Sequence, residues 1–443
     1  MATAAVLLDM LGRAALQLVT GPFYYIAVLF IILQYTRGMA MERQMFAVKL
    51  HDWKTLTLKA VGAGLMIGVA VSLAGAFVGA SLTPEAILWL WGAALLLMLL
   101  RIRYLCFAYG AGAIALLQWL LGFLALEERS DWIGSAAASL ASIDAAGLLL
   151  LVALLHLAEA LLVRLQGDRL ATPMFLEGKR GKLVGGYLLQ GFWPVPLFLL
   201  VPAAEGSAHS AVWSWPTLLG GSGQQAWTIA ALPMIIGFTE MTRSLLPREK
   251  AKHAAQGLLL FSVILGAAAV SAWLVPWLLP LAALVSIGLH EVMIWRSRMK
   301  EASRTPLYVH DARGLRILGV VPGTPAEAMG LAAGEVLYKV NGQRVWTKEE
   351  LYEALVQNPA FCKLEVYNNA GELKFAQRAR YEGEHHQLGV ILAPDEQANY
   401  YAASGPASLL ELLRRRRTAN KRGPGGAGNS ASAPREALGE ERG

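Results

Sequence analysis

Residues 320–345, VVPGTPAEAMGLAAGEVLYKVNGQRV, decide the fold of the C-terminal part of this 443-residue chain. The apolar run at their start predicts a strand that stops at Pro322-Gly323, a turn signal. Pro325 predicts the first turn of a short helix, which Gly330 closes. A second apolar run then enters Asn341-Gly342, which predicts a tight turn between two strands.

The same alternation of strands and turns continues on both sides of this stretch. Thr347 and Glu350 have the spacing of a capping box, which predicts the start of an amphipathic helix. A hairpin is predicted around Asn369-Ala370-Gly371. The further elements expected are strands at 315–321, 363–367, 373–377 and 388–392 and the helix at 348–357.

The order and spacing of these elements resemble a bacterial PDZ domain over residues 305–394. The resemblance implies a small α+β domain that binds an extended peptide by strand addition, with a nest of backbone N–H groups for a terminal carboxylate. The nest has the pattern hydrophobic-Gly-hydrophobic, and its best match is Leu388-Gly389-Val390. Because this match comes late in the domain, the resemblance implies the circularly permuted bacterial arrangement.

A peptide groove is therefore expected between the strand 388–392 and the helix 348–357. Gly389 is expected to leave room for the ligand carboxylate, since it has no side chain. Nearby cationic groups would favour an anion. A zinc site at His385 and His386 is not expected, because no third ligand is suitably spaced. The candidate peptide-binding residues are Leu388, Gly389, Val390, Ile391, Lys348, Leu351, Tyr352, Leu355, Arg378, Arg380 and His386.

The rest of the chain has a different composition. Hydrophobic residues make up 55% of the whole and charged residues only 16%, and 33 of the 71 charges lie in residues 1–295, leaving 38 for the last 148 residues. A soluble domain carries about 25% charge, so residues 1–295 are expected to be embedded in a membrane. Two cysteines exclude a secreted disulfide framework.

Apolar stretches near the length of a transmembrane helix recur in residues 1–295, which predicts an α-helical polytopic bundle of eight or nine spans. The last two join around Pro276, which leaves the number open by one. The stretches are 20–36, 60–81, 85–100, 105–126, 143–163, 183–204, 226–242, 257–275 and 277–295.

The distribution of basic residues predicts the orientation. One set of alternate connections carries twenty Lys and Arg residues and the opposite set only Arg13 and Arg129. Since basic loops stay in the cytosol, the PDZ-like domain and the C-terminus are expected there. Residues 296–304 are expected to be a basic juxtamembrane linker, and residues 395–443 a disordered basic tail able to touch anionic lipid. No fold supports nucleic-acid binding.

Two functions from other classes stay open at this point. A zinc protease needs His-Glu-x-x-His, and His290-Glu291 lacks the second histidine. A serine intramembrane protease would use Ser222, in a loop where Gly and Ser are common. A transporter would use Glu159 or Glu240, which lie near the cytosolic ends of their spans. No catalytic centre, metal site or cofactor is predicted.

Membrane spans followed by one cytosolic PDZ domain resemble the MinJ-type cell-division topological determinants. The specific part is the stretch Ala360–Val366 (AFCKLEV), then Gly371-Glu372, Tyr381–His386 (YEGEHH) and Leu388-Gly389. The resemblance implies an adaptor at the cell membrane, at septum and poles, that links the polar scaffold DivIVA to the division inhibitor MinD. It implies no enzymatic activity.

Overall fold

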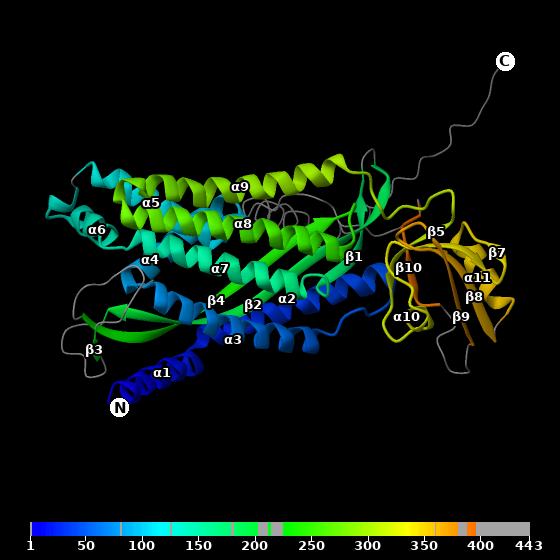
Figure 1. Cartoon of the computed structure of the whole chain (residues 1–443), viewed down its shortest axis with the longest axis horizontal. Helices are drawn as coiled ribbons and strands as arrows, with labels where there is room; N and C mark the ends of the chain where they lie inside the picture. Colours follow the sequence, from blue (N-terminus) through cyan, green and yellow to red (C-terminus); the bar gives the residue numbers. More distant parts are fainter. Residues whose placement is uncertain are drawn as a thin grey trace, which may run out of the picture.

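The computed structural model describes residues 2–79, 82–124, 126–178, 181–202, 211–213, 225–358, 360–379 and 388–395. Figure 1 shows an elongated helical unit, with long strands inside it, that carries a small β-rich unit at one end. The helices of the first unit are α1 (Ala2–Thr20), α2 (Pro22–Phe46), α3 (Trp53–Val78), α4 (Pro84–Leu100), α5 (Phe107–Gly122), α6 (Trp132–Ala141), α7 (Ala145–Gln166), α8 (Pro247–Leu274) and α9 (Leu279–Ser303).

The expected membrane helices are confirmed for most of the apolar stretches. Among the described residues, five helices are long and apolar enough to cross a bilayer: α2, α3, α7, α8 and α9. The shorter apolar helices α4, α5 and α6 accompany them. Many of their large apolar side chains are exposed, as expected of helices that face lipid.

Two of the nine predicted spans, 183–204 and 226–242, are strands, so the expectation of helices there is wrong. They form most of a sheet in the order β1-β2-β4-β3, made of β1 (Ala171–Glu177), β2 (Leu183–Pro202), β3 (Ala211–Trp213) and β4 (Gln225–Thr242). The prolines of β2 explain the difference, because proline inside a helix removes a hydrogen bond and clashes with the preceding turn. Hydropathy alone does not distinguish an apolar strand from an apolar helix.

Pro194 and Pro196 lie in the part of β2 that pairs with β4 but extends beyond the pairing with β1. Strand β1 pairs with β2 up to Leu189. Strand β4 pairs with β2 further along, where Pro194 lies opposite Ile235 and Pro196 opposite Pro233. Residues two apart in a strand direct their main-chain groups to the same side. The carbonyl groups of both prolines point at α3, away from β4, so the missing N–H groups would have faced a helix rather than a strand.

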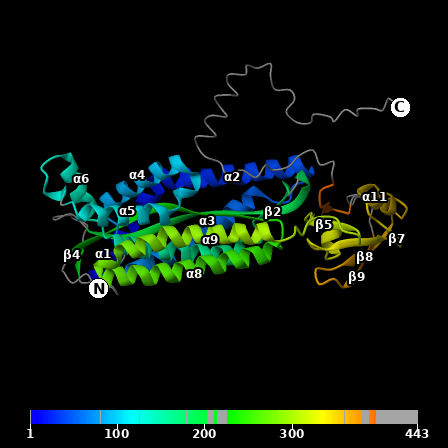
Figure 2. The ribbon, with the colours of Figure 1, turned by 90° about the horizontal axis from the view of Figure 1, so that it is seen from above.

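Helix α3 covers this edge with small residues. Any Cβ at Gly64 or Gly68 would overlap the carbonyl oxygens of Pro194 or Pro196, respectively. One helical turn further, Ser72 Oγ accepts a hydrogen bond from Phe198 N at 2.7 Å. Four residues of helix rise about 6 Å and two residues of strand about 6.6 Å, so the two rows stay in register. Figure 2 shows the long strands between α2 on one side and α8 and α9 on the other.

Residues 296–303, which we expected to be a linker, form the last turns of α9. Glu301 on this extension accepts hydrogen bonds from the N–H groups of Arg243 and Ser244, at 2.6 and 2.9 Å, where β4 turns into α8. Thr242 also donates to the Glu301 carboxylate, at 3.2 Å. The basic end of α9 is therefore held rigidly to the sheet, and the chain leaves regular structure only at Arg304.

The second unit has the strands and helices predicted from its turn signals. Its sheet order is β10-β5-β6-β8-β9, with β7 beside β6, so the last strand of the described chain pairs with the first strand of the unit. The Thr347 and Glu350 capping box is confirmed. The elements are β5 (Leu315–Val320), α10 (Pro325–Ala328), β6 (Val336–Val340), β7 (Gln343–Arg344), α11 (Lys348–Val356), β8 (Phe361–Tyr367), β9 (Leu373–Ala379) and β10 (Val390–Leu392).

The second unit docks on the membrane unit through the β1–β2 hairpin. The Tyr187 hydroxyl of β2 donates to the Leu318 carbonyl in the middle of β5. Gly185 N donates to Tyr308 O at 2.9 Å, and Leu307 N donates to Arg243 O at 2.7 Å. The rings of Tyr187 and Tyr308 lie 5.3 Å apart at a steep angle, and Tyr308 is fully buried. Main-chain bonds and a buried aromatic pair therefore fix the orientation of this unit.

Gly64→Ala is expected to lower the stability of the chain in detergent by about 1–3 kcal/mol, because the new methyl group overlaps the Pro194 carbonyl. The matched control is Gly62→Ala on the same helix, where a Cβ meets nothing within 4 Å. That control should be neutral or more stable by up to about 1 kcal/mol, through helix propensity. Thermal unfolding of both variants measures the difference, and equal stability would contradict the close approach.

Tyr187→Phe is expected to loosen the docking, since it leaves the buried Leu318 carbonyl without its donor, a loss of about 1–2 kcal/mol. Hydrogen exchange of residues 305–310 should then accelerate by about 5- to 30-fold. Tyr24→Phe is the control, because the Tyr24 hydroxyl is buried and has no hydrogen-bond partner among the described residues. Unchanged exchange in Tyr187→Phe would show that this bond does not hold the two units together.

Candidate functional site

Strand β10 offers a main-chain edge for an added strand. Val321 N donates to Gly389 O at 2.8 Å and Ala393 N donates to Arg316 O at 2.9 Å, so Gly389 and Ala393 direct these groups toward β5. By alternation, Val390 and Leu392 direct theirs to the other side. Among the described residues, β10 has a strand partner only in β5. An extended peptide can therefore bond to the outer edge of Val390 and Leu392.

Helix α11 carries the expected second wall of the groove. Lys348, Tyr352 and Leu355 have the spacing i, i+4, i+7, which places them along one face of the helix. Lys348 is exposed, Tyr352 is 58% exposed and Leu355 is buried. Leu351 and Leu355 belong to the core of the unit together with Leu388 and Leu392. Along this face, the charged Lys348 is followed by the exposed ring of Tyr352 and then by the buried Leu355.

The structure requires a glycine at position 389 for a reason that differs from the expected one. Its φ is +85°, in the left-handed region, and a Cβ there would overlap the side chain of Thr324 at the start of α10. Ala326 N also donates to Leu388 O, at 3.0 Å. The glycine thus lets the turn before β10 pack on α10. Room for a ligand carboxylate is not needed to explain it.

Ile391 lies on the opposite face from the groove. Side chains alternate along a strand, and Val390 and Leu392 pack with the core of the small unit. Ile391 instead joins the cluster that contains Tyr187, Tyr308 and Leu318. The expectation that Ile391 lines the peptide groove is therefore wrong, because its side chain contributes to the docking contact.

Of the cationic residues expected at the groove, the structure describes Lys348 and Arg378. Arg378 lies on β9, at the opposite end of the sheet order from β10. Arg380 and His386, like His385, lie outside the described residues. Lys348 on α11 is the cationic side chain that the structure places on the expected groove wall.

Asp311, Arg313 and Arg316 form a charged cluster at the start of β5. Arg313 and Arg316 both donate to Asp311, at 2.9 and 3.0 Å, and Arg316 also donates to Gly334 O at 2.7 Å. Burial raises the pKa of Asp311, but hydrogen bonds from Arg313 and the charges of both arginines outweigh it, so the pKa lies below its usual value. The ion pairs hold the segment that follows Tyr308 against the small unit.

Two acidic groups of the apolar unit have partners on neighbouring elements. Glu240 on β4 pairs with Lys250 on α8 at 2.9 Å, rather than with nearby Arg243. Glu291 on α9 pairs with Arg103 at 2.9 Å. Both carboxylates are therefore engaged by basic side chains. Ser222 and its Gly-rich loop lie outside the described residues.

Comparison with known proteins agrees with this arrangement. The PDZ domain family matches residues 316–366, which run from β5 through β8. The chain is 34% identical over 240 residues to the cell division topological determinant MinJ of Bacillus subtilis, a match that covers 53% of this chain and 58% of that protein. The match thus spans a little over half the length of the Bacillus relative.

Two lactobacillal relatives match over more of their length. The probable cell division topological determinant MinJ of Lacticaseibacillus paracasei is 31% identical over 347 residues, covering 76% of this chain and 85% of that protein. The protein of the same name from Lacticaseibacillus casei strain BD-II gives the same figures. With most of a relative's length aligned at this identity, the chain belongs to the MinJ family of cell division topological determinants.

Proposed function

We propose that this protein is a membrane adaptor whose PDZ domain binds a peptide segment of a partner and thereby positions the division-site machinery. The observation that carries the proposal is the outer edge of β10, where Val390 directs its main-chain groups away from β5. Leu388 and Leu392 share a core cluster with Leu351 and Leu355 of α11. The docking contact uses the opposite face, through Leu318 and Ile391. The groove and the membrane anchor therefore do not compete for the same surface.

The binding mode follows from the edge and the helix face. A ligand strand would bond to the main chain of Val390 and Leu392, and its alternate side chains would contact Tyr352 and the apolar core below it. Lys348, at the start of α11, would favour an acidic group on the ligand. Both a free C-terminus and an internal strand can use this edge.

The strand order supports a circularly permuted domain. Strand β10 comes last in the sequence, yet it pairs with β5, the first strand of the unit. In this arrangement the nest Leu388-Gly389-Val390 leads into the receiving strand β10. The same residues are joined to α10 through Leu388 O.

Charge supports a cytosolic PDZ domain and C-terminus. The end of the molecule that bears the PDZ domain also bears the basic end of α9 and the turn between β4 and α8. Basic residues near membrane helices favour the cytosolic side. The two long strands replace two expected helices, so the parity of the count of membrane crossings is the same whether or not β2 and β4 cross.

The family supports the choice of partners. The relatives are named cell division topological determinants, which fits a role in cell division for this chain. For this chain we propose DivIVA and MinD as the partners to be linked, at septum and poles, with no catalytic step. The ion pairs of Glu240 and Glu291 support an adaptor over a transporter or protease.

Val390→Pro tests the strand addition directly. Proline removes the outward N–H without removing a bond to β5, so the domain should stay folded while partner binding falls by about 10-fold. Tyr352→Ala removes the exposed ring on α11 and should weaken binding similarly. Both are measured on the full chain in nanodiscs against purified DivIVA and MinD, and as the localisation of each partner in cells.

Glu353→Ala is the matched control, because Glu353 is exposed on the same helix but is not in the i, i+4, i+7 row. It should bind partners as the unchanged chain does, and all three variants should remain in the membrane. Normal binding and normal partner localisation with both Val390→Pro and Tyr352→Ala would refute the groove as the site of recruitment.

A further inference from the structure

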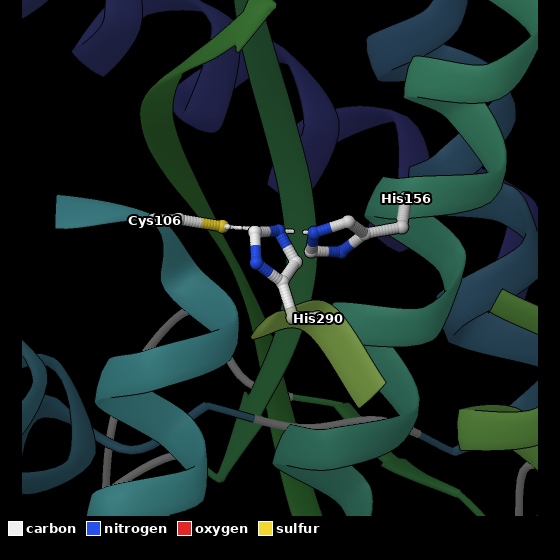
Figure 3. A group of neighbouring side chains, drawn as sticks. All are labelled: Cys106, His156 and His290. Atoms are coloured by element: carbon white, nitrogen blue, oxygen red, sulfur yellow. Dashed lines mark hydrogen bonds between the residues drawn. The ribbon is translucent and has the colours of Figure 1, made fainter. Parts of the chain in front are cut away.

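Three metal-binding side chains meet inside the membrane unit, from elements that are distant in the sequence. Cys106 directly precedes α5, His156 lies in the middle of α7 and His290 in the middle of α9 (Figure 3). Their ligand atoms all lie within 4.8 Å of one another. Both histidines are buried and Cys106 is partly buried.

The distances fit one tetrahedral metal ion. Cys106 Sγ lies 3.6 Å from His156 Nε2 and 3.7 Å from His290 Nε2. A Zn²⁺ ion with its usual bonds, about 2.3 Å to sulfur and about 2.0–2.1 Å to nitrogen, separates sulfur from nitrogen by about 3.6 Å at the tetrahedral angle. Both sulfur–nitrogen separations therefore suit such an ion.

The tautomers of the two histidines are set by their other ring atoms. His156 Nδ1 lies 2.8 Å from Val152 O, a group that can only accept, so Nδ1 carries the proton. His290 Nδ1 lies 3.0 Å from the Tyr109 hydroxyl, which itself donates to Glu291 Oε1 at 2.8 Å. The hydroxyl must then accept from His290 Nδ1. Each histidine consequently directs the lone pair of Nε2 at Cys106.

This arrangement has one acceptor too many for a thiol. Cys106 has a single S–H hydrogen, whereas two Nε2 lone pairs converge on its sulfur. One of the two buried acceptors would therefore lack a donor, which is unfavourable. A cation coordinated by a thiolate and both nitrogens satisfies all three groups at once.

A further set of contacts fixes the ring of His290 through its Nδ1 atom. Arg103 pairs with Glu291 at 2.9 Å, and Glu291 accepts from Tyr109, which holds Nδ1 of His290. Histidine ligands of metal ions characteristically donate their other N–H to such a partner, which fixes the ring. Phe261 packs on both histidine rings, with centroids 4.7 and 5.4 Å away, and closes the apolar side.

We propose that Cys106, His156 and His290 form a binding site for one transition-metal ion, with Zn²⁺ as the ion that fits the donor set and distances. A thiolate with two imidazoles selects borderline or soft ions over Mg²⁺ or Ca²⁺. Three protein ligands leave the fourth position for water or another donor. Glu291 is engaged by Arg103 and Tyr109, and the proposed role of the ion is to tie the helices together.

The bound ion would link three helical elements beside the part of α9 that leads to the PDZ domain. α9 continues from His290 to Ser303, where Glu301 is fixed to the turn between β4 and α8. Joining α9 to α5 and α7 at His290 would fix the helix at a second point. The metal site would thus stabilise the base on which the PDZ domain is oriented.

The test uses the full chain purified in detergent, stripped with a chelator and reloaded separately with Zn²⁺ and Co²⁺. We expect about one ion per chain by elemental analysis, and a thiolate-to-cobalt charge-transfer band that reports sulfur coordination. Zn²⁺ should also raise the midpoint of thermal unfolding. Cys106→Ala should abolish the band and the shift, and His290→Gln should weaken Co²⁺ binding by at least about 10-fold.

Cys362→Ala is the matched control, because Cys362 is the other cysteine and lies buried in β8 of the PDZ domain. It should keep the cobalt band and the metal content of the unchanged chain. If Cys106→Ala does not fold, His290→Gln and the band of the unchanged chain still decide the question. Absence of a thiolate band in the folded, unchanged chain, or identical metal binding by Cys106→Ala, overturns the proposal.

Discussion

The covered edge of β2 is the constraint on which the rest of the structure depends. A strand beside lipid-facing helices must satisfy every main-chain polar group within the protein, because hydrocarbon offers no hydrogen bonds. Here two N–H groups are eliminated by Pro194 and Pro196, and a third is bonded by Ser72. The small residues of α3 allow the helix to approach this edge closely. The apolar sheet can therefore exist inside the helical unit.

That sheet carries the PDZ domain. β2 begins in the hairpin with β1, where Gly185 and Tyr187 contact Tyr308 and Leu318. The end of α9 is tied to the same region through Glu301. Two connections, one through the hairpin and one through the helix, thus fix how the domain lies on its anchor. The outer edge of β10, where we propose that a ligand strand binds, faces away from β5.

The two faces of β10 explain how one short strand serves two roles. Val390 and Leu392 belong to the PDZ core, whereas Ile391 belongs to the cluster around Tyr187. Because side chains alternate across a strand, the docked face and the proposed binding face of β10 are separated by a single residue. A ligand strand would add to the edge of β10 and leave its docked face in place. Peptide binding and membrane attachment can then occur together.

The sequence by itself determined the PDZ domain, the apolar unit and most of its helices. Turn signals such as Pro322-Gly323 and the capping box at Thr347 act over a few residues, so they can be recognised locally. Only the tertiary structure decided that 183–202 is a strand, because Pro194 and Pro196 are tolerable only where α3 covers their edge. The tertiary structure also decided that Ile391 packs in the docking contact with Tyr187. It also brought Cys106 to His156 and His290, which lie 50 and 184 residues away along the chain, since helix packing ignores sequence distance.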